Sequence, residues 1–242
     1  MELKTSAIVL HHVKYTDTSL VATIYTRLQG RKSFLVQGVY KPRSKFPASY
    51  FQPLTLLDLE ISINPRRELQ RIRELALHVP FHSVPFDITR GTIALFLAEI
   101  LYKTLREEEP NPVLFDFLFH AIQFFDLNDE GAANFHLWFL INFTKHLGFY
   151  PDNNFSSAHP VFDPMNGRFF SPMMVQPTER ELQNGVWLSK FMEASLEEAG
   201  KLKLNHSIRN SLLMILVEYY QVHLGGLGQI KSLPVLQNVF ED

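Results

Sequence analysis

Residues 30–46 read GRKSFLVQGVYKPRSKF, a short apolar run followed by a segment rich in basic and aromatic residues. The apolar part, Phe34 to Val36, predicts a β-strand, and the segment after it predicts a loop. Cations that neutralise phosphates, beside rings on which bases can stack, are typical of surfaces that bind single-stranded nucleic acid. The alternative is a solvated loop on an ordinary β-domain, and the stretch alone does not distinguish the two.

Four more β-rich segments surround this stretch within the first 80 residues. They cover residues 4–12, 19–26, 51–62 and 69–79, with short polar or glycine-containing turns between them. The last of them is also compatible with a helix. Five strands in so short a segment predict a small barrel, and a five-stranded oligonucleotide-binding barrel (OB-fold) matches this size and strand count.

Beyond Pro80 the apolar spacing changes from that of strands to that of helices. The first helix is expected from residue 87 or 89 to about 108, and a second, after Pro110-Asn111-Pro112, runs to about 127. Further helices are expected over 132–147, 188–199 and 206–224. Residues 151–177 are proline-rich and irregular, with a possible hairpin around 163–167. The sequence therefore predicts an α+β, multidomain protein: an OB-fold domain at 1–80 and an all-α helical domain at 81–242 that carries this irregular inserted segment.

The composition is that of a globular protein, with 46% hydrophobic and 20% charged residues in 242. Residues 1–80 hold 12 Lys and Arg against 6 Asp and Glu, a balance of +6, whereas the remainder holds 11 against 19, a balance of −8. This asymmetry indicates that the N-terminal part meets a polyanion. The absence of cysteine fits a reducing compartment, and neither a signal peptide nor an apolar run of membrane-spanning length is found, so a cytoplasmic protein is expected.

Motifs for catalysis are not found in the sequence. It lacks a Gly-x-Ser-x-Gly elbow, a phosphate-binding Gly-Lys-Ser/Thr loop and a His-Glu-x-x-His pair. The ten histidines lack the spacing of metal ligands; Pro80, for example, separates His78 from His82. We therefore predict no catalytic residue, no metal site and no cofactor, and a protein that is not an enzyme.

The candidate nucleic-acid interface is formed by basic and aromatic residues of the first 80 positions. The expected phosphate contacts are Arg31, Lys32, Lys41, Arg43, Lys45, Arg66 and Arg67. Either Tyr40 or Phe46 is expected to stack on bases. Such binding tolerates many sequences and weakens with salt, because counterion release from the phosphates dominates it.

Several short motifs, in order along the whole chain, resemble the RecO family of bacterial DNA repair and recombination mediators. The most specific is residues 51–60, FQPLTLLDLE, close to the family's Leu-Gln-Pro-Phe-Thr-Leu-Leu-Glu-Leu-Glu pattern. Others are AIVL at 7–10 followed by YTD at 15–17, Gly38 followed by the basic loop, and LGFYP at 147–151. LGG at 224–226, followed by Lys231-Ser232, also matches.

The resemblance implies a function as well as a fold. Family members bind single- and double-stranded DNA, anneal complementary strands, and in the RecFOR pathway work with RecR to load RecA onto DNA covered by single-strand-binding protein. The chain would then act in the cytoplasm, on the nucleoid. The family also implies an apolar pocket with a basic rim, in the helical half, that receives the acidic C-terminal tail of single-strand-binding protein; Lys103 and Arg106 are candidate rim residues.

Many family members carry a four-cysteine zinc module after the Leu-Gly-x-x-Pro motif. Here residues 151–177 contain no cysteine, so we interpret them as a remnant of that module without zinc. Two other classes of function stay open: a structural adaptor whose basic loop meets acidic proteins, and a nuclease. A nuclease would need clustered carboxylates, and the sequence places none outside the predicted helix ends.

Overall fold

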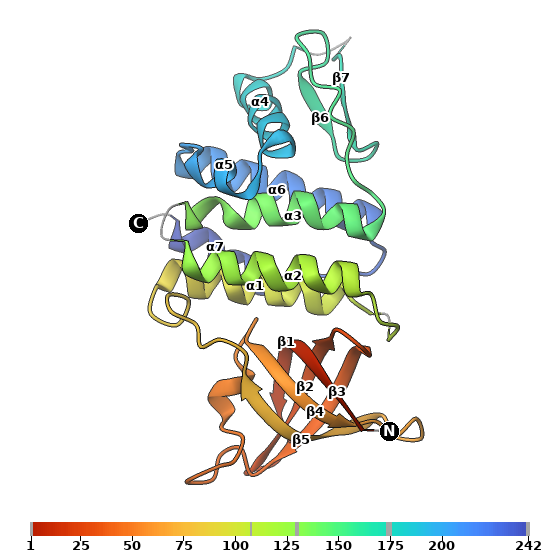
Figure 1. The fold of residues 1–242 in the computed structure, drawn as a ribbon. Coiled ribbons are helices and arrows are strands. Elements are labelled where there is room, and N and C mark those ends of the chain that lie inside the picture. Colours follow the sequence, from red (N-terminus) through yellow and green to blue (C-terminus); the bar gives the residue numbers. More distant parts are fainter. Residues whose placement is uncertain (1, 107, 129–130, 173–175, 241–242) are drawn as a thin grey trace. The chain divides into compact units, whose positions relative to one another are not determined.

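The computed structural model of the chain describes residues 2–106, 108–128, 131–172 and 176–240 (Figure 1). These residues cluster into two compact units, 1–127 and 128–242. The first unit contains the β-barrel with helices α1 and α2, and the second contains a small hairpin with helices α3 to α7. Glu107, near the predicted end of a helix, and residues 173–175 of the predicted zinc-module remnant lie outside the described residues.

Five strands close into a barrel in the order β1-β2-β3-β5-β4, in the red to orange part of Figure 1. They are β1 (Glu2–Lys14), β2 (Ser19–Thr26), β3 (Gly30–Gln37), β4 (Leu56–Ser62) and β5 (Leu69–Leu77). All neighbours are antiparallel except β3 and β5, which pair in parallel through Ser33 with Leu69 and Phe34 with Gln70. The predicted fold class, a five-stranded OB-fold barrel followed by helices, is confirmed.

Alternating apolar residues fill the barrel, as expected where one face of each strand is buried. Phe34 and Val36 of β3 and Leu57, Leu59 and Ile61 of β4 belong to one cluster of buried side chains. Their polar neighbours on the same strands point away from this cluster. The basic residues of β3 are therefore confined to its outer face and its ends.

The largest difference from the predicted strands is the start of β4, and the structure also decides between strand and helix at β5. β4 begins at Leu56 rather than at Phe51, because residues 48–51 form a 3-10 helix, η1 (Ala48–Phe51), and Leu54 has a φ of 63°, outside the strand region. The helix alternative for residues 69–79 is wrong, since β5 pairs with β4 along most of its length. Its register shifts between Ile72 and Glu74, which makes Arg73 the extra residue of a β-bulge.

Helices α1 (Ile88–Thr104) and α2 (Pro112–Leu127) complete the first unit. The side chain of Asp87 accepts a hydrogen bond from the Arg90 N–H and begins α1, so of the two predicted starts, 87 and 89, the structure has the first. Asn111 does the same for α2 by accepting from the Leu114 N–H at 3.0 Å. The Arg27 guanidinium, in the turn after β2, donates two hydrogen bonds to the Asp116 carboxylate of α2, at 2.8 and 3.1 Å, and so joins that helix to the barrel.

In its described residues, the second unit consists of helices, one hairpin and two isolated β-bridges. Its elements are η2 (Ala132–Asn134), α3 (Phe135–Leu147), β6 (Val161–Asp163), β7 (Arg168–Phe170), α4 (Glu179–Glu193), α5 (Leu196–Lys201), α6 (His206–His223) and α7 (Leu233–Val239). The predicted ends of α3, at Gly148, and of α6, before Gly225, are confirmed, as is the hairpin around residues 163–167. Among the described helices, none is both long and apolar enough to cross a membrane.

The helix expected at 188–199 is two helices, α4 and α5, and α4 begins nine positions earlier. Each starts with a capping box, Thr178 with Glu181 and Ser195 with Glu198, in which side chain and backbone bond reciprocally. Helix α7 was not predicted, although Ser232 precedes it and a proline occupies its first turn.

Candidate nucleic-acid interface

The basic loop, residues 38–47, leaves the C-terminal end of β3 and folds into two successive turns. The Lys41 N–H donates to the Gly38 carbonyl, and the Ser44 N–H donates to the Lys41 carbonyl, both at 3.1 Å. Gly38 has a φ of 76° and Arg43 a φ of 58°, so the loop uses the left-handed region twice, once without glycine. The side chains of Lys41, Arg43 and Lys45 are all exposed.

Lys45 differs from the other two cations of the basic loop because it is held on β5. Its ammonium donates to the Glu74 carboxylate at 2.7 Å and to the Arg73 carbonyl at 3.1 Å, and it lies 5.1 Å from the centre of the Phe46 ring. Both members of the Lys45–Glu74 pair are more than half exposed, so the pair is a weak, solvent-screened one.

The two aromatic candidates have different environments. Phe46 is partly buried and packs against the apolar cluster of the barrel. Tyr40 is 44% exposed, in the first turn of the basic loop next to Lys41. Tyr40 is therefore the more accessible ring of the pair.

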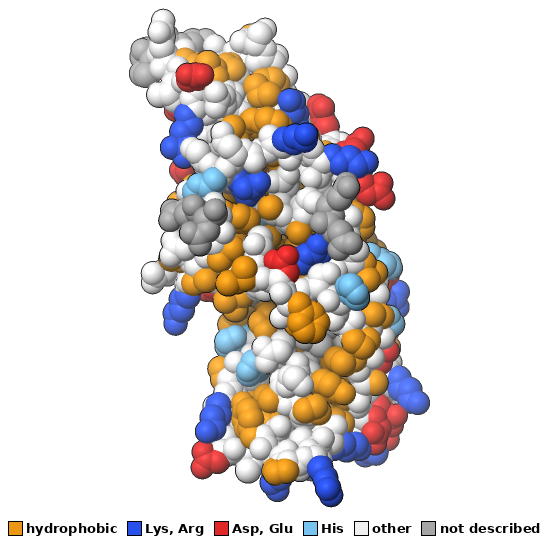
Figure 2. Space-filling model, turned by 90° about the vertical axis from the view of Figure 1, so that its left-hand side faces the viewer, with side chains coloured by type: hydrophobic (Ala, Val, Ile, Leu, Met, Phe, Trp, Pro, Cys, Tyr) orange, Lys and Arg blue, Asp and Glu red, His pale blue; other side chains and the backbone are white. Residues whose placement is uncertain are grey.

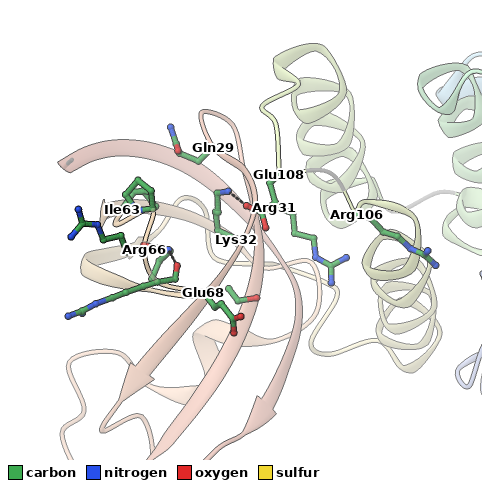
Figure 3. Close-up of a pocket in the computed structure, with 12 residues that line it drawn as sticks. Gln29, Arg31, Lys32, Ile63, Arg66, Glu68, Arg106 and Glu108 are labelled. Carbon is green, nitrogen blue, oxygen red and sulfur yellow. Dashed lines mark hydrogen bonds and ion pairs between the residues drawn. The ribbon is translucent and has the colours of Figure 1, made fainter.

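A second group of basic residues surrounds a groove of about 540 Å³ near the N-terminal end of β3 (Figure 3). Its lining includes Arg31 and Lys32 of β3, Arg66 and Arg67 of the β4–β5 loop, and Arg106. Two carboxylates, Glu68 and Glu108, also line it. This surface, called the groove below, is mostly but not purely basic.

The β4–β5 loop is shaped by one buried side chain. The amide of Gln70, on the inner side of β5, accepts from the Asn64 N–H at 2.8 Å and donates to the Asn64 and Arg67 carbonyls. The Asn64 side chain in turn accepts from the Arg66 N–H at 3.0 Å. These bonds fix the backbone that carries Arg66 and Arg67 while leaving both guanidinium groups exposed.

Arg31 is engaged within the protein. Its guanidinium donates to the carbonyls of Tyr102 and Leu105, both at 2.7 Å, and lies 4.5 Å from the centre of the Tyr102 ring. The final carbonyls of a helix have no partner within it, and a cation there is favourable. Arg31 therefore closes the C-terminal end of α1, and its donors are turned toward that helix.

Lys32 is also engaged, with an acid from the segment that follows α1. Its ammonium donates to the Glu108 carboxylate at 2.5 Å; the Lys32 side chain is 16% exposed and that of Glu108 is 76% exposed. The hydrogen bond and charge of Lys32 lower the pKa of Glu108. This pair, drawn as a dashed line in Figure 3, spans one wall of the groove.

The two basic groups lie at opposite ends of β3. Gln37 at the C-terminal end pairs with Ser19, beside the basic loop, whereas Ser33 pairs with Leu69, beside the β4–β5 loop. The structure thus brings Arg31, Lys32, Arg66 and Arg67 together, and separately groups Tyr40, Lys41, Arg43, Lys45 and Phe46.

Arg71 of β5 was not among the predicted residues, although it lies between the two groups. Its side chain is exposed, because its neighbour Ile72 packs against the barrel core. Arg73, in the bulge, pairs with Glu2 at 2.5 Å. The period-2 pattern of β5 could have placed Arg71 outside, but the bulge at Arg73 obscured that period.

The two candidate rim residues for a protein tail, Lys103 and Arg106, belong to the first compact unit. Lys103 lies 3.6 Å from Glu99 in the next-to-last turn of α1. The Arg106 side chain donates to the Lys103 carbonyl at 3.1 Å and lines the groove together with Arg31 and Lys32. Of this pair, Arg106 therefore lies beside basic residues of the barrel.

Acids accompany many of the basic side chains. On the face drawn in Figure 2, several Lys and Arg groups have an Asp or Glu beside them. Within the described part of the chain, no group of three His, Asp or Glu side chains is arranged to hold a metal ion.

A closed five-stranded barrel with basic loops at both ends of one strand has the architecture of the oligonucleotide-binding class of barrels. Comparison with known proteins is more specific. Residues 1–81 match the family described as Recombination protein O N terminal, and residues 85–160 match Recombination protein O C terminal.

Relatives matched over nearly their whole length indicate the same family. The DNA repair protein RecO of Flavobacterium psychrophilum is 37% identical over 241 residues, covering 99% of this chain and 100% of the relative. That of Bacteroides fragilis (strain ATCC 25285) is 38% identical over 244 residues, covering 98% and 99%. That of Porphyromonas gingivalis is 32% identical over 246 residues and covers both chains completely. The chain belongs to the RecO family, and its role lies in DNA repair.

Proposed function

We propose that this chain binds single- and double-stranded DNA through its barrel, anneals complementary strands, and works with RecR to load RecA onto DNA covered by single-strand-binding protein. It performs this role in the cytoplasm, on the nucleoid, as a binding protein rather than as an enzyme. Family membership supports a role in repair, and the surface of the barrel supports the way in which DNA is held.

The basic loop is the observation that carries the proposal. Lys41 and Arg43 present exposed cations beside the exposed ring of Tyr40, on a backbone fixed by two turns. Cations neutralise the phosphates, and an aromatic ring stacks on any base, so the surface holds a strand without reading its sequence. A strand held by its backbone keeps its base edges available to a complementary strand, which is what annealing requires.

Protein partners follow from the same proposal. The acidic C-terminal tail of single-strand-binding protein would dock on a basic rim, and Arg106 is the member of the predicted pair that lines a groove with other cations. RecR and, indirectly, RecA would act on the complex that this docking places on the DNA.

The test is a mobility-shift titration with a labelled oligonucleotide, comparing wild type with the double variant Lys41→Ala, Arg43→Asn. Asparagine tolerates the left-handed φ of Arg43, so the loop backbone is kept while its charge is removed. The matched control is Lys201→Ala, Lys203→Ala, which removes two exposed cations from the second unit.

We expect the loop variant to bind single-stranded DNA at least about tenfold more weakly at low salt, since each lost phosphate contact reduces counterion release. The control should bind like wild type. A wild-type chain that shifts no oligonucleotide would refute the proposal and favour an adaptor for acidic proteins. Shortening of labelled DNA with a divalent metal ion would instead identify a nuclease.

A further inference from the structure

The groove contains an acid where its proposed ligand would place a phosphate. Glu108 accepts a hydrogen bond from Lys32, the more buried partner of the pair. A carboxylate and a phosphodiester offer the same kind of charged oxygen acceptor to an ammonium group. While this pair is formed, the Lys32 charge is neutralised by the protein itself.

The segment that carries Glu108 is held in place by more than this ion pair. Arg31 fixes the end of α1, from which the segment leaves, through the Tyr102 and Leu105 carbonyls. Gly30, with a φ of 59°, lies directly beneath it: a Cβ at Gly30 would come within 2.8 Å of Glu108 backbone atoms. The backbone is thus positioned by packing, while the mostly exposed Glu108 side chain is able to turn away.

The acidic run belongs to the same compact unit as the barrel. With the boundary at residue 127, the first unit holds 15 Lys and Arg against 13 Asp and Glu, a balance of +2 compared with +6 for residues 1–80. Three of the seven additional acids are Glu107, Glu108 and Glu109. Glu108 is the described member of this run that lines the groove.

We propose that Glu108 is an intramolecular competitor for the groove, which its side chain must leave when a nucleic-acid backbone phosphate binds Lys32. The inference rests on the proposed DNA binding and adds a regulation of that site. A lone phosphate at Lys32 makes one charged contact in place of the one that the Glu108 carboxylate already makes, so it has no advantage over Glu108. A polyanion also contacts Arg66 and Arg67, and these additional contacts allow it to displace the Glu108 carboxylate from Lys32. The competition therefore favours long nucleic acid over small anions.

The test is fluorescence anisotropy with a labelled single-stranded oligonucleotide at low salt. Glu108→Gln should bind about two- to fivefold more tightly than wild type, the range expected from the loss of one ion pair whose acid is exposed to solvent. The matched control is Glu109→Gln, the same charge change at an exposed neighbour that does not line the groove. It should bind like wild type. Because salt screens the pair, the gain of Glu108→Gln should shrink as salt is raised.

A double-mutant cycle with Lys32→Gln separates competition from general repulsion. If Glu108 acts through Lys32, Glu108→Gln gains nothing in the Lys32→Gln background. An equal gain in both backgrounds, an equal gain for Glu109→Gln, or no gain at all overturns the competition while wild-type DNA binding stands. Absence of binding by wild type and by Glu108→Gln overturns the proposed function together with this inference. Thermal unfolding of each variant verifies that the fold is retained.

Discussion

Tyr40 and Phe46 occupy the same loop, but their rings face different surroundings. Phe46 packs against the barrel cluster, and Tyr40 is 44% exposed. The sequence could not decide between them, because both rings flank the same cations and the direction of each side chain depends on how the loop turns. The two roles can be separated by measuring affinity and stability on the same variants.

Replacing Tyr40 by alanine should weaken single-stranded DNA binding by roughly 1–3 kcal/mol, the cost of one lost base–aromatic stack, and leave the free energy of unfolding nearly unchanged. Phe46→Ala should show the reverse, losing about 1–3 kcal/mol of stability because it leaves a gap in the barrel wall. Anisotropy and urea unfolding measure the two quantities. Normal affinity of Tyr40→Ala would remove this ring from the interface, and Tyr40→Phe is the control that keeps the ring.

Arg31 shows where charge alone misleads. In the sequence it belongs to a basic pair, Arg31-Lys32, ahead of a basic loop. In the structure the pair is divided: Arg31 bonds to the carbonyls at the end of α1, and Lys32 meets Glu108. Neither contact could be predicted, because each joins positions more than 70 residues apart. The exposure of Lys41 and Arg43, in contrast, follows from local turn chemistry that the sequence displays.

At the level of strands and helices, local signals predicted most of the fold. β2 was expected at 19–26 and found there, Gly148 marked the end of α3, and Asp87 was one of the two predicted starts of α1. Some errors passed over local signals, such as the capping boxes that begin α4 and α5, and others arose where tertiary packing changes the local pattern. In β5, Ile72, Leu75 and Leu77 all face the barrel, which a regular strand would not allow; the bulge at Arg73 makes it possible.

The hairpin β6–β7 is held by side chains in a segment where relatives of this fold were expected to use zinc. The Asn154 side chain donates to the Phe169 carbonyl at 2.9 Å and accepts from the Phe169 N–H at 2.7 Å. The Phe169 ring contacts those of Phe155 and Phe162, and Phe162 contacts Tyr219 of α6. One amide staple and an aromatic cluster thus fix a hairpin whose strands have three residues each.

We therefore expect the stability of the second unit to be independent of zinc. A chelator should leave the melting temperature unchanged, and metal analysis should find no stoichiometric zinc. Asn154→Ala should lower the free energy of unfolding by about 1–2 kcal/mol through two lost hydrogen bonds, with faster proteolysis of residues 161–170. Asn154→Asp, which keeps the acceptor but loses the donor, should show a partial loss. Stoichiometric zinc would contradict the interpretation of residues 151–177 as a metal-free remnant.

Helix α3 contains a buried histidine, and we expect it to make the stability of the second unit depend on pH. His136 is fully buried and stacks on Phe240 at 5.4 Å; burial and then the nearby Arg209 charge lower its pKa from 6.5 to about 3. The unfolded chain binds a proton below pH 6.5 and the folded chain does not. Stability is therefore complete above pH 6.5 and is lost as the pH falls toward 3.

This loss should begin near pH 6.5 and should steepen to roughly 1 kcal/mol per pH unit between about pH 5.5 and pH 4. Both tryptophans of the chain, Trp138 and Trp187, lie in the second unit, so urea unfolding followed by tryptophan fluorescence reports on that unit alone. His136→Leu should flatten the pH dependence between 6.5 and 5. An equally steep dependence in this variant would assign the acid sensitivity to other groups.

Across the first compact unit, the two basic groups at the ends of β3 raise the question of whether one DNA strand meets both. Arg71 of β5 is an exposed cation placed in the chain between the β4–β5 loop and the residues that hold Lys45, so a strand crossing from one group to the other would meet it. Each neutralised phosphate of a single strand contributes about 0.7 to the slope of log affinity against log salt. If one strand meets both basic groups, the phosphates neutralised at each end of β3 both add to this slope.

If one strand follows this path, Lys41→Ala with Arg43→Asn should reduce the magnitude of the slope by about 1.4, and so should Arg66→Ala with Arg67→Ala. The fourfold variant should reduce it by about 2.8, and the Lys201→Ala, Lys203→Ala control should leave it unchanged. If only one pair changes the single-strand slope, the other end of the barrel is free while that strand is bound. Annealing would then proceed with the complementary strand held at the opposite end of β3, and the second pair would lower the annealing rate without lowering single-strand affinity.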